Sequence, residues 1–298
     1  MPDLIECPES IFVKPELNSP GLSHKYRAAK LIIDEAVSQG AITPGTTTVI
    51  EKTGGNFGLG LVFACQHHGI DVELAVGLSF SQKKRRLLEF LGARLIGQEM
   101  LKRGMTPKEV IDFHLSQQHS MGKKYYFPDQ FSNRLGIEAH RQETGHELAR
   151  SLADRSNLAK DIIFIGGAGT GASMTGISIA LRESGFSLQS ILVEPDGSNM
   201  RTGSFSDHRL EGISVGVPAP FLDWDLISGV QSVTLDEVLA AQRWFFQNTG
   251  LLIGNSSAAN IAVARRLRRN QTFKNLPLIT IAYDSGSWYD DFMNAPRP

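Results

Sequence analysis

The sequence has few of the features that mark secreted, metal-binding, nucleic-acid-binding or membrane proteins. It holds two cysteines, Cys7 and Cys65, which excludes a disulfide framework or a cysteine metal site and favours a reducing compartment. Its 30 Lys and Arg nearly balance its 31 Asp and Glu, so it lacks the basic charge that nucleic-acid binding needs. Apolar runs such as Ile162–Ile165 are far too short to cross a bilayer.

The first 15 residues also lack the basic and apolar parts of a signal peptide. We therefore expect a cytoplasmic protein without a metal, a nucleic-acid partner or a membrane partner. With 41% hydrophobic and 20% charged residues, the composition is that of a globular protein, and 298 residues suggest about two domains.

Short apolar runs alternate with segments of helical period. Strands are predicted at 47–51, 72–76, 94–96, 162–165, 190–194, 230–235 and 278–282, and helices at 57–68, 82–91, 172–182, 236–248 and 257–268. This alternation indicates an α/β protein whose parallel-type sheets carry flanking helices. Ligands of such sheets bind beyond the carboxyl ends of the strands.

Glycine is abundant, with 29 residues, and its richest cluster runs from Gly166 to Gly176. The cluster follows a predicted strand and opens a predicted helix. Glycines let the backbone approach a ligand closely, and N–H groups at a helix N-terminus bind anions. Thr170 and Ser173 add hydroxyl donors, so a phosphate is the expected ligand. A tight strand-to-helix turn without a ligand would also use glycine.

The same segment fits a dinucleotide fingerprint. Gly167, Gly169 and Ala172 match G-x-G-x-x-G/A, and Glu194 ends the next predicted strand, where a ribose-binding acid is found in such proteins. Taken alone, these residues favour an NAD-dependent dehydrogenase, and that alternative stays open here.

A second cluster, Thr53–Gly60, also joins a strand to a helix and suits a carboxylate. Asn56 within it equally suits a helix N-cap. A third segment, Asn18–Arg27, is a turn followed by a helix start that carries Lys25. Partial burial near cationic or dipolar groups lowers the pKa of a lysine and makes it a Schiff-base nucleophile.

The ordered set of motifs resembles the cysteine synthase (O-acetylserine sulfhydrylase)/cystathionine β-synthase family of fold-type II pyridoxal-phosphate enzymes. The matches run in family order over nearly the whole chain: Asn18–Arg27 (N-P-G-x-S-x-K-D-R), Glu51–Gly58 (E-P-T-S-G-N-T-G), Gln130–Asn133 (Q-F-x-N), His140–Leu148 (H-x-x-T-G-x-E), Gly169–Gly176 (G-T-G-G-T-x-T-G), Gly254–Ala258 (G-x-S-S-G) and Asp284–Gly286 (D-S-G).

The resemblance implies a tryptophan synthase β-like fold with two lobes, the smaller and mobile one at 19–134 and the larger, cofactor-anchoring one at 1–18 and 135–298. It also implies roles. Lys25 would form the internal aldimine with pyridoxal 5'-phosphate and move the Cα proton, and Asn56 would bond the ring oxygen. The phosphate would be bound by Gly169, Thr170, Gly171, Ala172 and Ser173.

Ser256 would face the pyridine nitrogen, although it also suits a helix N-cap. The substrate carboxylate would be surrounded by Thr53, Gly54, Asn56, Phe57 and Gln130. Gly54 and Phe57 depart from the family, which has serine and threonine there, so two hydroxyl donors are lost. Tyr26 replaces the aspartate that follows the family's lysine.

The implied reaction is β-replacement on a small amino acid with a β-leaving group, such as an O-activated serine, through an α-aminoacrylate. A second nucleophile, such as sulfide or a thiol, would then add. The enzyme would be a homodimer. β-Elimination by a lyase or dehydratase is an alternative within the same cofactor class. An NAD-dependent dehydrogenase and a non-catalytic pyridoxal-phosphate-binding relative are alternatives of another class.

Overall fold

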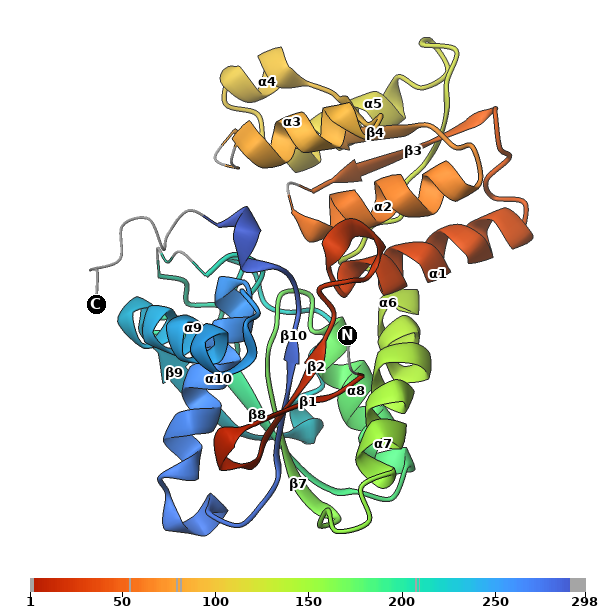
Figure 1. Cartoon of the computed structure of the whole chain (residues 1–298). Coiled ribbons are helices and arrows are strands. Elements are labelled where there is room, and N and C mark those ends of the chain that lie inside the picture. Colours follow the sequence, from red (N-terminus) through yellow and green to blue (C-terminus); the bar gives the residue numbers. More distant parts are fainter. Residues whose placement is uncertain are drawn as a thin grey trace. The chain divides into compact units, whose positions relative to one another are not determined.

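We analysed a computed structural model, which describes residues 3–53, 55–78, 80, 82–206, 208 and 210–289. The chain divides into two compact units, one formed by residues 1–18 and 137–298 and the other by residues 19–136. Each unit is built around its own sheet (Figure 1).

The sheet of the larger unit has six strands in the order β1-β2-β10-β7-β8-β9. They are β1 (Ile5–Cys7), β2 (Ile11–Pro15), β7 (Asp161–Gly167), β8 (Ser187–Pro195), β9 (Ile227–Val233) and β10 (Leu278–Ala282). All neighbours pair in parallel except β1 and β2. The strand–helix alternation did not predict this antiparallel edge, because the short strands β1 and β2 are joined by the three-residue 3-10 turn η1 (Pro8–Ser10) rather than by an α-helix.

Helices cover both faces of this sheet. They are α6 (Leu135–Ala139), which contains the division after Gly136, η3 (His140–Gly145), α7 (His146–Ala153), α8 (Ala172–Glu183), α9 (Leu235–Thr249) and α10 (Asn255–Arg268). Strand β7 contributes side chains to the helix packing on both faces of the sheet, because successive side chains of a strand point to opposite faces. Ile163 and Ile165 pack with buried residues of α9 and α10, whereas Ile162 and Phe164 pack with those of α7 and α8.

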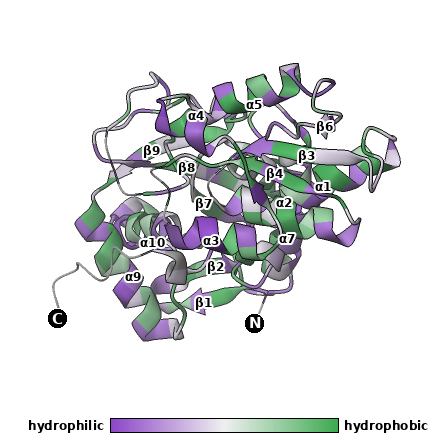
Figure 2. Cartoon of the chain, turned by 90° about the horizontal axis from the view of Figure 1, so that it is seen from above, coloured by the Kyte–Doolittle hydropathy of each residue, from purple (hydrophilic) through white to green (hydrophobic). Residues whose placement is uncertain are grey.

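The smaller unit has a four-stranded parallel sheet in the order β5-β4-β3-β6. Its strands are β3 (Thr47–Lys52), β4 (Val72–Ala75), β5 (Arg94–Leu95) and β6 (Lys124–Tyr126), and its helices are α1 (Lys25–Ser38), α2 (Asn56–His67), α3 (Gln82–Phe90), α4 (Gln98–Lys102) and α5 (Pro107–Ser116). Helix α3 is largely hydrophilic in Figure 2, and only Lys84 and Leu88 of it are buried.

Every strand and helix that the apolar pattern predicted is present within a few residues of its expected bounds, and the predicted α/β class is confirmed. The pattern missed β6 and the helices around it. Among the described residues, no helix combines the length and apolar character that crossing a membrane requires.

Candidate active site

The glycine-rich loop lies where strand β7 ends and helix α8 begins, at the carboxyl edge of the larger sheet. Gly171 is the N-cap of α8 and has a left-handed φ of 89°, which glycine adopts without strain. The Thr170 hydroxyl accepts a hydrogen bond from the Ala172 N–H at 3.3 Å, which leaves its O–H as a donor. Because the first N–H groups of a helix have no partner within it, this end of α8 suits an anion.

The segment at 212–221 packs against the glycine-rich loop and bonds to its backbone. The Ser214 N–H donates to the Ala168 carbonyl, and the Phe221 N–H donates to the Thr170 carbonyl, both at 2.9 Å. A side chain at Gly169 would place its Cβ 2.5 Å from the Gly212 carbonyl oxygen. The glycine-rich loop is therefore held rigidly, and glycine is required at position 169 by this close backbone packing.

Ser256 lies in the first turn of α10, and its side chain is buried. Gly254 is the N-cap of α10, so the interpretation of Ser256 as the cap is wrong. The start of α10 is tied to the segment after β10, because the Gly254 N–H donates to the Asp284 carbonyl at 3.0 Å. Ser257 adds a second tie by accepting a hydrogen bond from the Tyr283 N–H at 2.9 Å.

Tyr283 connects this segment to the glycine-rich loop. Its hydroxyl accepts from the Gly167 N–H at 3.1 Å and donates to the Gly167 carbonyl at 3.3 Å. Burial raises the pKa of Tyr283 to about 12, so the hydroxyl stays protonated. Reasoning from the sequence missed this residue, although it directly precedes the D-S-G motif, which was the available signal.

Glu194, the expected ribose-binding acid, has a different partner. Its buried carboxylate accepts a hydrogen bond from the Met200 N–H at 2.6 Å and so holds the loop that follows β8. The stretch at His140–Leu148 also serves the fold. His140 and Thr144 bond to each other at 3.0 Å, and Glu147 pairs with the buried Lys14 at 2.8 Å.

In the smaller unit, Lys25 is the first residue of α1. Its side chain is half-buried, and burial lowers the pKa of Lys25 from 10.5 to about 8. The helix dipole acts in the same direction, since a positive charge is unfavourable at a helix N-terminus. Ser23, two residues earlier, is fully buried, and its hydroxyl has no hydrogen-bond partner among the described residues.

Two glycines bring Lys25 close to helix α2. A Cβ at Gly60 would lie 3.1 Å from the Tyr26 backbone, and one at Gly21 would lie 3.2 Å from the Gly60 nitrogen. The turn before Lys25 and the start of α1 therefore pack directly on the backbone of α2. As a result, Lys25 lies near the N-terminal part of α2, where Asn56 is the first residue.

The loop before α2 carries the expected carboxylate-binding residues. Gly55 is the N-cap of α2, so the interpretation of Asn56 as the cap is wrong. Phe57 is 3% exposed, which places its ring inside the protein, while Thr53 is half-buried. A Cβ at Gly55 would meet no atom within 4 Å, so this side of the loop is open. Gly54 lies outside the described residues.

Gln130 follows strand β6, the neighbour of β3. Its N–H donates to the buried Glu51 carboxylate at 3.3 Å. Lys25, Thr53, Asn56, Phe57 and Gln130 thus all belong to the smaller unit, whereas the glycine-rich loop and Ser256 belong to the larger unit.

Comparison with known proteins identifies the family. Residues 2–282 match the model of the pyridoxal-phosphate dependent enzymes. The chain belongs to this family. The cysteine synthase A of Escherichia coli is 30% identical over 288 residues, which cover 94% of this chain and 86% of that protein. A cysteine synthase of Staphylococcus aureus is 29% identical over 283 residues, with 94% and 87% covered.

Solved structures show the same relationship. The O-acetylserine dependent cystathionine beta-synthase of Helicobacter pylori has a TM-score of 0.80 and 28% identity, covering 94% of this chain and 88% of that chain. A hydrogen sulfide-producing enzyme of Fusobacterium nucleatum has a TM-score of 0.83 and 27% identity, covering 96% and 93%. The resemblance drawn from the motifs is therefore confirmed, and the expected cofactor is pyridoxal phosphate.

The residues of this pyridoxal-phosphate dependent enzyme fit its cofactor. The N-terminus of the 12-residue helix α8, with the buried hydroxyls of Thr170 and Ser173, suits the phosphate. A lysine with a lowered pKa suits the aldehyde. The NAD alternative is set aside, because the family is known and Glu194 is engaged within the fold.

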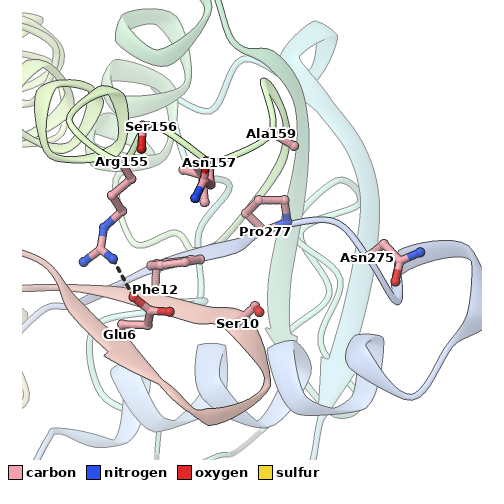
Figure 3. Close-up of a pocket in the computed structure, with 10 residues that line it drawn as sticks. Glu6, Ser10, Phe12, Arg155, Ser156, Asn157, Ala159, Asn275 and Pro277 are labelled. Carbon is pink, nitrogen blue, oxygen red and sulfur yellow. Dashed lines mark hydrogen bonds and ion pairs between the residues drawn. The ribbon is translucent and has the colours of Figure 1, made fainter.

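One surface pocket of this enzyme, about 420 Å³ in volume, is a separate feature (Figure 3). It lies at the amino edge of the larger sheet, where β2, β7 and β10 begin, whereas the glycine-rich loop lies at the carboxyl edge. Arg155 on its wall pairs with Glu6 at 2.5 Å and lies over the Phe12 ring. The pocket therefore takes no part in the cofactor site.

Proposed function

We propose that this enzyme catalyses β-replacement on a small amino acid with a β-leaving group, such as an O-activated serine, with a sulfur nucleophile as second substrate. The observation that carries the proposal is Lys25, which is the half-buried first residue of α1 and has its pKa lowered to about 8, in the same unit as the open glycine loop before α2. Cysteine synthases and an O-acetylserine dependent enzyme among the relatives support the substrate class. We also propose that it acts in the cytoplasm as a homodimer.

Pyridoxal phosphate supplies an electron sink that stabilises negative charge on the substrate Cα. The neutral amine of Lys25 takes the Cα proton, and the bond from Cβ to the leaving group breaks. The second nucleophile then forms the new bond at Cβ, and the proton returns from Lys25 to Cα. A lysine whose pKa is about 8 suits both directions of this transfer, because proton exchange is most efficient when the pKa is close to the working pH.

The remaining residues bind and orient. The backbone at Gly169, Gly171 and Ala172 and the hydroxyls of Thr170 and Ser173 would hold the phosphate, and Asn56 would hold the ring oxygen. Ser256 would offer the ring nitrogen a neutral hydroxyl, which would favour loss of a leaving group over transamination because it does not enforce ring protonation.

Thr53, Asn56, Phe57 and Gln130 orient the substrate carboxylate, with Gly54 as a further member of the loop. Without the family's serine and threonine hydroxyls, backbone N–H groups at the start of α2 carry more of this binding. The smaller domain, expected at 19–134, is proposed to close on the substrate and exclude water.

The Lys25→Ala variant tests the proposal. We expect the wild type to be yellow, to be fixed covalently to its cofactor by borohydride, and to form a thioether or thiol product from O-acetylserine and sulfide or a thiol. The activity of the variant should be lower than that of the wild type by a factor of about 10²–10⁴. Covalent labelling of the variant would contradict the role of Lys25.

The products distinguish the alternatives. Release of keto acid and ammonia without a second substrate would indicate β-elimination, which the hydrogen sulfide-producing relative makes worth testing. A bound cofactor with no turnover of any serine derivative would indicate a non-catalytic relative.

A further inference from the structure

The buried side chain of Glu51 contacts both loops that carry the proposed carboxylate-binding residues. Glu51 lies near the end of β3 and has no solvent exposure. One of its carboxylate oxygens accepts from the Lys52 N–H at 2.9 Å, and the other accepts from the Gln130 N–H at 3.3 Å. Lys52 directly precedes Thr53, which begins the first loop (the segment between β3 and α2). The second loop is the segment after β6 that contains Gln130. The Glu51 side chain therefore joins the start of the first loop to the second loop.

The sheet topology explains why the two loops are close. Strands β3 and β6 are parallel neighbours, with Val49 opposite Tyr126. The segments that follow them leave the sheet at the same edge, since parallel strands share the direction of their carboxyl ends. The Lys52 side chain adds a second connection, because its ammonium lies 3.4 Å from the Asp129 carboxylate and 5.3 Å from the centre of the Phe131 ring.

The second loop turns sharply at Asp129. Its φ of 44° is left-handed, a conformation that aspartate adopts more readily than most residues. The turn is held by the Ser132 and Asn133 N–H groups, which both donate to the Asp129 carbonyl at 2.9 Å. Gln130 therefore sits in a turn whose position depends on Glu51 and Lys52.

A carboxylate at this place is costly for stability alone. Burial raises the pKa of Glu51 to about 8, which reflects the loss of solvent around it. Well-packed apolar side chains often replace buried charges without loss of stability. A glutamate, however, offers two separate acceptor oxygens, and here each of them bonds a backbone N–H group from a different segment, which no apolar side chain can do.

We propose that Glu51 is a positioning residue, which fixes the backbone before Thr53 against Gln130 so that both loops present their donors to the substrate carboxylate. This inference rests on the proposed function, because it assigns a role at the same substrate site. Glu51 acts through Lys52 and Gln130 and does not touch the substrate itself.

The test uses the holoenzyme and the variants Glu51→Ala and Glu51→Gln. The KM for the amino-acid substrate should rise about tenfold in E51A and less in E51Q, which keeps one acceptor, while kcat stays within about twofold. The visible absorbance of the cofactor and its retention should not change.

A second readout isolates the carboxylate. Dissociation constants are measured from the change in visible absorbance when the amino acid, or its carboxamide, is added. The wild type should prefer the amino acid, and this preference should shrink in E51A about as much as KM rises. Unchanged preference and KM in E51A, with a responsive wild type, would overturn the inference. A wild type that responds to no amino acid would instead overturn the proposed function.

Glu73→Gln is the matched control. Glu73 is a buried carboxylate on the neighbouring strand β4 and is bonded to Arg94, Lys123 and Tyr125; among the described residues it bonds to neither loop. E73Q should leave the preference for the carboxylate unchanged. If E51A does not fold, the same KM and binding measurements are made on E51Q and Asp129→Asn instead. D129N removes the charge that pairs with Lys52 and alters the hydrogen bond that the Asp129 carboxylate accepts from the Ser132 hydroxyl, so it should raise KM about two- to threefold.

Discussion

At the scale of single residues, burial decides which groups can react. The thiols of Cys7 and Cys65 are buried, and burial raises the pKa of each to about 12, so neither is a nucleophile near neutral pH. Burial acts on Lys25 in the opposite direction, because it disfavours the charged ammonium. Burial therefore makes the neutral amine of Lys25 more accessible near neutral pH and keeps both thiols protonated.

The pKa of Lys25 predicts how cofactor capture depends on pH. Only the neutral amine attacks an aldehyde, and Lys25 becomes neutral as the pH rises through about 8. The rate at which cofactor-free protein acquires visible absorbance on mixing with pyridoxal phosphate should therefore rise to a plateau above this pH. A rate that keeps climbing towards pH 10.5, the ordinary lysine value, would contradict the lowered pKa.

At the scale of elements, two glycines set the position of helix α8, whose N-terminus is the proposed phosphate site. Gly176 of α8 faces the backbone of α6 and η3, since a Cβ there would lie 2.5 Å from the Ile137 carbonyl oxygen and 2.9 Å from the Arg141 nitrogen. Gly145 of η3 faces Ala180 of α8 in the same way. The family motifs at both positions thus serve helix packing.

Gly176→Ala should move α8 away from η3. We expect a loss of about 1–3 kcal/mol in the free energy of unfolding, because the added methyl group meets rigid backbone. We also expect weaker retention of the cofactor. Urea unfolding and absorbance after dialysis measure the two effects.

Gly229→Ala in β9 is the control for this variant, since its Cβ would touch only the flexible end of Ile191, at 3.2 Å. It should change the free energy of unfolding by less than about 0.5 kcal/mol. Equal effects of the two variants would argue against the packing explanation.

At the scale of the whole molecule, each unit has a core of its own. The larger unit buries clusters on both faces of its sheet, and the smaller unit buries a cluster around Ile50, Ala75 and Val110. Because the proposed cofactor ligands are arranged only in the folded chain, binding of the cofactor should stabilise the native state.

Removal of the cofactor should therefore lower the urea midpoint of unfolding. A ligand that binds only the native state adds about 2.7 kcal/mol at a concentration 100 times its Kd. Pyridoxal without its phosphate should stabilise much less, because it leaves the N-terminus of α8 unfilled. Equal stabilisation by the two compounds would show that the glycine-rich loop does not bind the phosphate.

The sequence by itself determined the α/β class, the bounds of the main strands and helices, the family and the cofactor. It could do so because apolar periodicity and glycine spacing are local, and short ordered motifs such as Gly169–Gly176 are specific as a set. Local pattern was ambiguous where one residue type serves two roles. Asn56 and Ser256 suited either a helix N-cap or a cofactor contact, and Glu194 suited either a ribose contact or a structural bond.

Only the tertiary structure decided between those uses, because contacts between distant segments leave no local pattern. It gave the capping of α2 and α10 to Gly55 and Gly254, and it paired Glu194 with Met200. It also joined Tyr283 to Gly167, which lies 116 residues away, and Glu51 to Gln130, which lies 79 residues away. A hydrogen bond of this kind depends on which strands become neighbours, and that is settled when the whole sheet forms.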